Sequence, residues 1–293
     1  MNEPVRVMLM LNSLHGGGAE RVAVHLLNRC DPGLVDIRMG LLRKTGPFVA
    51  AADDHARIDT APIGADWLDF EGHNSAFYRP DKLLAASVLA PANLRAMIKA
   101  QRPAVVMSFL KGMSVATYFA VRRMRPDRPA WIVREGNNTD AVIEDELTGA
   151  AGRALIKGVT RRCYRAADCF LANSHEMARG LTTTLGLDPS RVRVIQNPID
   201  LAAVRAAALA PLPAARDRPF ILTVGRLEYQ KGHDLLLRAF AASPRRRDMD
   251  LVILGQGSLE AELKRQAAAL GIASRVRFPG FVANPWAWIA RAR

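Results

Sequence analysis

Two cations flanked by glycines form the most specific candidate site in this sequence. Arg226 follows Gly225, Lys231 precedes Gly232, and the stretch begins where the apolar run 220–224 ends. A guanidinium offers a planar fork of donors and an ammonium offers a compact charge, so the pair could hold a diphosphate. The alternative is a solvated surface loop. The position after an apolar run favours the diphosphate.

Glycines also gather after two other apolar runs, namely Gly16, Gly17, Gly18, Gly255 and Gly257. Glycine lets the backbone approach a ligand closely, and a helix that starts at such a loop directs unpaired N–H groups at an anion. The first cluster is neither a dinucleotide-binding loop nor a Walker loop. A tight turn without a ligand stays an open interpretation for both.

A charge pair and two amides follow the apolar run 129–133, namely Arg134, Glu135, Asn137 and Asn138. The carboxyl end of a parallel strand is where open α/β sheets bind ligands, although consecutive asparagines also form turns. Neither His175-Glu176 nor Asp248-Met249-Asp250 indicates a metal site. The first lacks a second histidine, and the second precedes a strand instead of following one.

These residues need a scaffold, and the chain alternates short apolar runs with helical segments. The expected strands are 5–12, 35–42, 104–109, 129–133, 169–172, 191–195, 220–224, 250–254 and 276–278. The pattern predicts an α/β fold with two Rossmann-like, doubly wound parallel sheets, the second incomplete. We assign residues 1–200 to the first domain, 201–217 to an Ala/Pro-rich linker and 218–293 to the second domain.

Composition excludes several classes of protein. The 293 residues are 49% hydrophobic, which rules out a disordered chain, and no apolar stretch has the length of a membrane span. The net charge of +13 attracts phosphates, but an aromatic content of 6% argues against nucleic acid as a partner. Three cysteines without metal or redox spacing favour a reduced, cytoplasmic protein.

One basic stripe has helical spacing, at Arg153, Lys157, Arg161 and Arg165. On a helix these side chains share one face. The stripe is either an ordinary solvated face or a surface that rests on anionic lipid headgroups.

Together the motifs resemble glycosyltransferase family 4, which comprises retaining sugar transferases of the GT-B fold. The matching segments are Gly16-Gly17-Gly18-Ala19-Glu20-Arg21, Leu171-Ala172-Asn173-Ser174, Val194-Ile195-Gln196-Asn197-Pro198-Ile199-Asp200, Thr223-Val224-Gly225-Arg226-Leu227 with Gln230-Lys231-Gly232, and Leu254-Gly255-Gln256-Gly257. The resemblance covers nearly the whole chain. It implies an N-terminal domain that holds the acceptor and a C-terminal domain that holds a nucleotide sugar.

The resemblance also implies roles for single residues. Arg226 and Lys231 match positions that bind the donor diphosphate, so no metal is needed, and Gly17 and Gly18 match a loop that approaches the donor. Many members have a histidine where this chain has Glu135, which makes Glu135 the candidate catalytic residue. The remaining cleft candidates are Gly16, Arg134, Asn137, Asn138, Gly225, Gly255 and Gly257.

The implied substrates are a nucleotide-diphosphate sugar, with a UDP-sugar expected, and a glycan or polyprenyl-diphosphate-linked acceptor of cell-surface polysaccharide biosynthesis. The implied location is the cytoplasm, at the inner face of the plasma membrane. The family's Glu-x7-Glu segment should follow Arg293, because Glu262 is the last glutamate. We therefore expect a C-terminally truncated enzyme. The alternative is a non-catalytic basic module that binds anionic lipid or nucleic acid.

Overall fold

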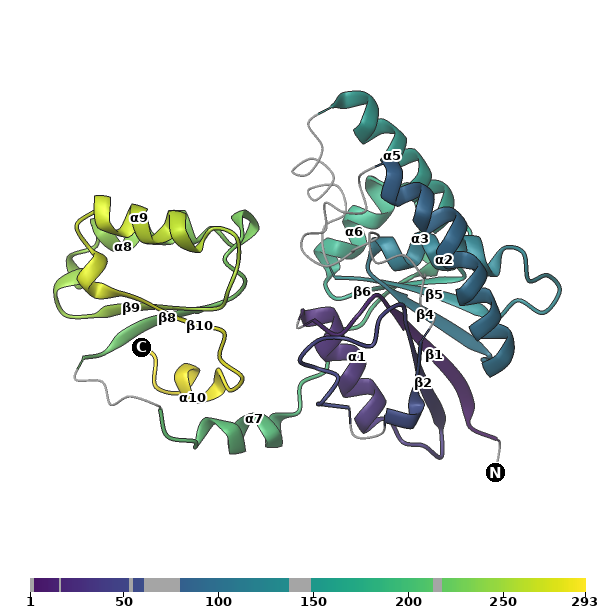
Figure 1. Cartoon of the computed structure of the whole chain (residues 1–293), viewed down its shortest axis with the longest axis horizontal. Helices are drawn as coiled ribbons and strands as arrows, with labels where there is room; N and C mark the ends of the chain where they lie inside the picture. The colour runs from purple at the N-terminus through teal and green to yellow at the C-terminus, as the bar shows by residue number, and fades with distance from the viewer. Residues whose placement is uncertain (1–2, 16, 53–54, 61–79, 137–148, 213–217) are drawn as a thin grey trace. The chain divides into compact units, whose positions relative to one another are not determined.

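The computed structural model describes residues 3–15, 17–52, 55–60, 80–136, 149–212 and 218–293 (Figure 1). The chain divides into two compact units, which we call unit 1 (Met1–Pro198) and unit 2 (Ile199–Arg293). Each unit has its own parallel sheet.

Unit 1 contains a seven-stranded parallel sheet in the order β3-β2-β1-β4-β5-β6-β7. The strands are β1 (Val5–Leu11), β2 (Val35–Leu41), β3 (Ile58–Thr60), β4 (Val105–Phe109), β5 (Ala130–Glu135), β6 (Cys169–Ala172) and β7 (Val192–Val194). The chain moves one way from β1 to β3 and the other way from β4 to β7, which confirms the predicted doubly wound sheet.

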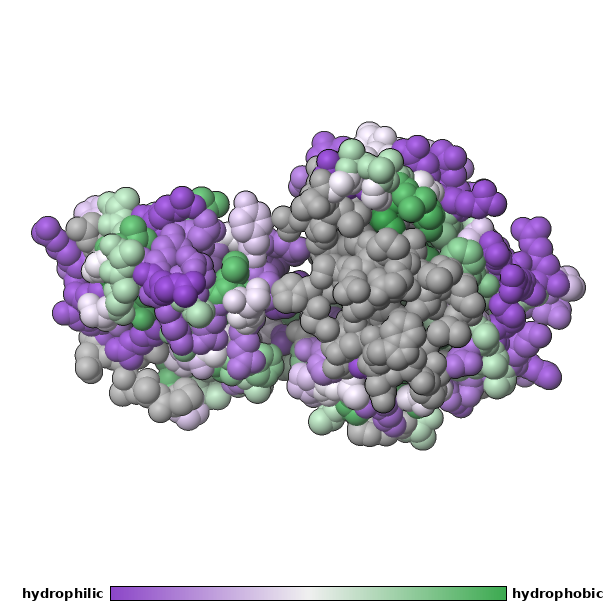
Figure 2. Space-filling model, turned by 45° about the horizontal axis from the view of Figure 1, so that its top comes forward, coloured by the Kyte–Doolittle hydropathy of each residue, from purple (hydrophilic) through white to green (hydrophobic). Residues whose placement is uncertain are grey.

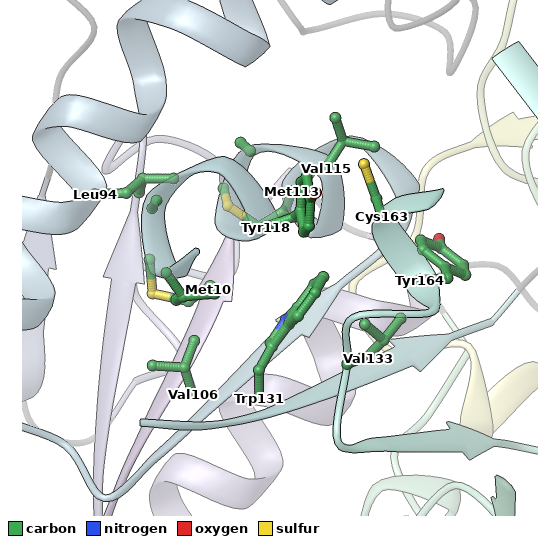
Figure 3. Close-up of a cluster of buried hydrophobic side chains, with 14 of the residues drawn as sticks. Met10, Leu94, Val106, Met113, Val115, Tyr118, Trp131, Val133, Cys163 and Tyr164 are labelled. Atoms are coloured by element: carbon green, nitrogen blue, oxygen red, sulfur yellow. The ribbon is translucent and has the colours of Figure 1, made fainter. Parts of the chain in front are cut away.

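Helices cover both faces of this sheet. They are α1 (Gly18–Arg29), α2 (Pro80–Gln101), α3 (Lys111–Val121), α5 (Ala150–Tyr164) and α6 (His175–Thr183), with short 3-10 turns η1 (His55–Arg57) and η3 (Pro189–Arg191). The α1 side and the α2, α3, α5 and α6 side have separate apolar cores (Figure 1). In Figure 3, Trp131 and Val133 of β5 lie below α3 in the larger core.

Three elements of unit 1 differ from what the sequence indicates. Strand β3 is not among the expected strands. Helix α2 begins at Pro80, although Pro91 would favour a start beyond it, because proline normally breaks a helix. Strand β5 continues to Glu135 instead of ending at Val133. Arg134 and Glu135 are therefore strand residues, and their side chains point to opposite faces of the sheet.

Unit 2 contains a three-stranded parallel sheet in the order β10-β9-β8. Its elements are α7 (Leu201–Ala208), β8 (Phe220–Val224), η4 (Tyr229–Lys231), α8 (His233–Ala242), η5 (Pro244–Arg247), β9 (Asp250–Leu254), α9 (Glu260–Ala269), η6 (Ala273–Arg275), β10 (Val276–Gly280) and α10 (Trp286–Ile289). Leu237 and Leu263 pack on one face of the sheet, and Trp288 packs on the other.

The segment 201–217, predicted to be a linker, begins with a helix that packs inside unit 2. The side chain of Asn284 donates to the carbonyl oxygen of Ala207 at 2.8 Å, and Arg291 donates to that of Ala208 at 3.1 Å. These bonds hold α7 against the α10 region. The chain division falls between Pro198 and Ile199, ahead of α7.

Candidate functional site

The loops that follow β8 and β9 are joined backbone to backbone at the carboxyl edge of unit 2. The amide of Gly225 donates to Leu254 O and the amide of Leu227 donates to Gln256 O, both at 2.9 Å. The amide of Leu259 returns a bond to Leu227 O at 3.0 Å. Side chains on these loops are therefore held on a fixed frame.

Gly255 and Gly257 make this contact possible. A Cβ on Gly255 would lie 1.9 Å from Gly225 O, and Gly255 has a φ of +138°, a conformation that favours glycine. A Cβ on Gly257 would lie 2.4 Å from Leu227 O. The approach of one loop to the other thus explains both glycines without a ligand. Their predicted place in a binding site stays a prediction.

Arg226 and Lys231 lie on this frame with their charged groups exposed. In the described part of the chain, neither side chain makes a hydrogen bond or an ion pair. The stem of Lys231 runs beside Gly225, where a Cβ would lie 3.7 Å from the Lys231 side chain. Two unpaired cations at the carboxyl end of a strand are suited to a ligand with several negative oxygens.

Two helical cations of unit 2, by contrast, are paired with acids on their own helices. Arg238 contacts Asp234 at 2.6 Å, and Lys264 contacts Glu260 at 2.7 Å. In the described part of the chain, Arg226 and Lys231 lack such a partner, as does the exposed Arg205 of α7.

His233 is a residue of this site that the sequence interpretation missed. It begins α8 and is 3% exposed, and its Nε2 lies 3.1 Å from Arg226 O. Because a carbonyl oxygen only accepts, Nε2 carries the proton and donates. The sequence feature that could have identified His233 is a polar residue directly after Gly232, at the start of a helix. His233 ties the Arg226 backbone to α8.

We expect His233→Phe to weaken UDP binding about fivefold, the loss that corresponds to one net hydrogen bond. Phenylalanine keeps the packing but cannot donate to Arg226 O. The effect should vanish when Arg226 is already alanine, because His233 acts through Arg226. Titration calorimetry with UDP on the wild type, the two single variants and the double variant measures these losses. Equal losses in both backgrounds would mean that His233 is merely structural.

In unit 1, Gly17 is the N-cap residue of α1. Its backbone is extended, and no side chain makes a capping hydrogen bond at this helix start. A Cβ on Gly17 would meet the carboxylate of Glu20 at 2.3 Å, whereas a Cβ on Gly18 would meet nothing within 4 Å. Space therefore does not require glycine at Gly18. The candidates Gly16, Asn137 and Asn138 lie outside the described residues.

Glu135 lies on the α3 and α5 face of the sheet and is 3% exposed. Its Oε1 accepts a hydrogen bond from the hydroxyl of Tyr164, which Figure 3 places beside Val133. Burial raises the pKa of Glu135 from 4.5 to about 7, against the opposing effects of Tyr164, Lys111 and Arg134. The carboxyl group thus has a partner inside the domain. A catalytic role for Glu135 stays a prediction.

We expect Glu135 to make the free energy of unfolding fall as the pH rises from about 4.5 to about 7. The folded state keeps this proton while the unfolded chain releases it, so higher pH favours unfolding. Glu135→Gln keeps an acceptor for Tyr164 but cannot ionise, so its stability should lack this fall. Urea titrations at pH 5 and pH 8 compare the two proteins. The exposed Glu176→Gln is the control, and an identical pH dependence in wild type and Glu135→Gln would contradict the assignment.

Arg134 lies on the other face of the sheet from Glu135 and is 7% exposed. Its Nη2 donates to Asn197 Oδ1 at 2.5 Å, and its guanidinium lies 5.1 Å from the centre of the Phe109 ring. The sequence placed Arg134 and Glu135 in one site, but the alternation of the strand directs them apart. Arg134 remains a candidate ligand-binding residue on the α1 side.

A cavity of about 310 Å³ opens at the carboxyl ends of β5 and β6. Gly136, Asn173, Ser174 and Glu176 line one part of it, and other residues of α6 together with Leu185 line the rest. Ser174 caps α6 by accepting from the amide of Met177 at 3.1 Å. Asn173 and Ser174 belong to a motif found in the sequence, but their place in a cavity was not predicted.

The family comparisons agree with the two units. A family described as "Glycosyltransferase Family 4" matches residues 16–203, and one described as "Glycosyl transferases group 1" matches residues 205–293. The first match covers more than half of the chain.

Curated relatives match part of the chain. An N-acetylgalactosamine-N,N'-diacetylbacillosaminyl-diphospho-undecaprenol 4-alpha-N-acetylgalactosaminyltransferase of Campylobacter jejuni is 33% identical over 57% of this chain and 47% of the relative. The lipopolysaccharide core biosynthesis glycosyltransferase LpsE of Rhizobium meliloti is 32% identical over 40% of this chain and 33% of the relative. The matches thus span less than half the length of these relatives.

Among solved structures, Anabaena HepE in complex with UDP-glucose aligns with a TM-score of 0.70 at 16% identity. The alignment covers 98% of this chain and 72% of HepE. The outer core galactosyltransferase WaaB aligns with a TM-score of 0.60 at 17% identity. These likenesses confirm the predicted GT-B fold class.

Proposed function

Because the chain belongs to glycosyltransferase family 4, we propose that it transfers a sugar from a nucleotide-diphosphate sugar to a glycan or lipid-linked acceptor. The observation that carries the proposal is the pair of unpaired cations, Arg226 and Lys231, on the joined loops of unit 2. The transfer belongs to cell-surface polysaccharide biosynthesis and proceeds with retention of configuration at the anomeric carbon.

The two cations supply the chemistry that this transfer needs. As the bond to the sugar breaks, negative charge develops on the departing nucleotide diphosphate. Fixed positive groups stabilise that charge more than they stabilise the intact donor, which lowers the barrier. We infer that Arg226 and Lys231 can do this without a metal ion.

UDP-sugar is the donor that we favour, because HepE, which shares the fold, was solved with UDP-glucose. The acceptor that we favour carries a polyprenyl diphosphate, because the Campylobacter relative is named for a diphospho-undecaprenol substrate. Family membership does not favour the alternative of a non-catalytic basic module.

A peripheral position at the inner face of the plasma membrane is part of the proposal. No described helix has the length and apolarity to cross a bilayer. Figure 2 shows hydrophobic residues on the visible face as small areas between hydrophilic ones. The basic stripe lies on α5, where Arg161 also donates to Thr184 O at 2.8 Å. Arg161 and Arg165 are exposed, whereas Arg153 and Lys157 are half-buried. The exposed pair would face anionic lipid.

Binding and transfer assays test the proposed function. UDP titrated into the chain by calorimetry should bind, and a labelled UDP-sugar should label a polyprenyl-diphosphate-linked glycan. Co-sedimentation with anionic vesicles in the presence and absence of UDP tests the membrane partner. Strong, salt-sensitive binding to vesicles or oligonucleotides, together with no binding of any nucleoside diphosphate, would favour the basic module.

A further inference from the structure

Arg134 is a buried cation that lacks a counter-ion in unit 1. Its side chain is held at the carboxyl end of β5, and its Nη1 is buried without a hydrogen-bond partner. Buried polar atoms in native proteins are nearly always bonded, so an unbonded guanidinium nitrogen calls for an explanation.

The surroundings of Arg134 do not neutralise it. Nη2 is bonded to the amide oxygen of Asn197, which is uncharged, and the guanidinium lies over the Phe109 ring. Within the described part of the chain, no carboxylate forms an ion pair with Arg134. Glu135 and Glu20 act on it at longer range, and burial outweighs both and lowers the pKa of Arg134. A desolvated charge without an anionic partner is costly, which favours an anion from outside the chain.

The guanidinium lies close to the surface and to a cavity. Asn197, its partner, is an exposed residue, so Arg134 lies close beneath the surface at this edge of the sheet. Gly136 lines the cavity at the ends of β5 and β6, and a Cβ on Gly136 would lie 3.9 Å from Arg134 Nη1. The unbonded nitrogen thus lies next to a residue that lines the cavity.

We propose that unit 1 contains its own oxyanion site, in which Arg134 Nη1 binds a phosphate oxygen of the acceptor substrate. The proposal rests on the proposed function, because Arg226 and Lys231 of unit 2 already account for the phosphates of the donor. Asn197 orients the guanidinium by accepting from Nη2, which leaves Nη1 for the ligand. The chemical class of the ligand is a phosphate or diphosphate ester.

Two variants remove the site in different ways. Arg134→Met removes the charge and the donors. Asn197→Asp leaves Arg134 in place but supplies a carboxylate at the position of the bonded amide, so that the guanidinium gains an internal counter-ion. Arg193→Met, an exposed arginine of β7, is the control for the loss of one positive charge.

The probes are inorganic pyrophosphate, farnesyl diphosphate and UDP, titrated by calorimetry at low salt. In a chain that carries Arg226→Ala and Lys231→Ala, pyrophosphate and farnesyl diphosphate should still bind at one site. Arg134→Met or Asn197→Asp in that background should weaken this binding about 10- to 100-fold, the change expected for a hydrogen bond to a charged group. Arg193→Met should not weaken it.

The outcomes separate this proposal from the proposed function. If wild type does not bind UDP, the donor site is contradicted. The pyrophosphate titration still tests the Arg134 site independently. Unchanged pyrophosphate affinity in Asn197→Asp overturns the oxyanion site, and this variant decides if Arg134→Met does not fold. If Asn197→Asp weakens UDP but not farnesyl diphosphate, the phosphate belongs to the donor and the acceptor assignment is wrong.

Discussion

Replacing Arg226 and Lys231 together by alanine should weaken UDP binding by about two to four orders of magnitude. Each hydrogen bond to a charged group contributes about 1.5–3 kcal/mol, and about 1.4 kcal/mol corresponds to a factor of ten. Because both side chains are exposed and unpaired in the described structure, the variant should unfold at the same temperature as wild type. Calorimetry at low salt measures the binding, and thermal melting checks the fold.

The control for this variant removes two other cations from the same unit. Arg238→Ala with Lys264→Ala changes the net charge equally, and both residues lie on helices where they pair with acids. This control should bind UDP as wild type does. Equal weakening by both double variants would mean that UDP responds to overall charge, and unchanged affinity in Arg226→Ala with Lys231→Ala would remove both residues from the site.

Gly255→Ala should destabilise unit 2 by about 3 kcal/mol or more and thereby weaken the binding of UDP. Two costs combine. The φ of +138° is strained for alanine, and the new Cβ would lie 1.9 Å from Gly225 O on the neighbouring loop. Backbone strain and overpacking each cost about 1–3 kcal/mol. The two loops would have to move apart to remove this close contact, and that movement would displace Arg226.

Two further glycines separate these costs. Gly257→Ala adds the close contact with Leu227 O without a left-handed φ, whereas Gly271→Ala has a φ of +68° and open space. Hydrogen exchange in the peptides of β8 and β9 reports the stability of unit 2 for each variant. We expect the largest loss of protection in Gly255→Ala and a loss in Gly271→Ala from strain alone. Full protection in both Gly255→Ala and Gly257→Ala would show that the loops do not need this contact.

The sequence predicted the strands of unit 2 well, since β8 and β9 coincide with the apolar runs 220–224 and 250–254. Parallel strands in the interior of an α/β unit have continuous apolar sequences, which a short window of the sequence reveals. This holds for the fully buried β9 and also for β8, which is half-buried at the edge of the sheet. The end of β5 was missed because Arg134 and Glu135 are charged. Their burial is made possible by partners that are distant in the sequence, Asn197 and Tyr164.

The sequence by itself determined the α/β class, the order of the motifs and the cations Arg226 and Lys231, because these depend on residue types and on spacing over a few positions. Only the tertiary structure decided which polar groups have partners. It gave Glu135 a buried partner in Tyr164, left Arg134 Nη1 without one, and tied Arg226 to His233. Hydrogen bonding and desolvation act over a few ångströms in space, so they depend on neighbours that only the fold brings together.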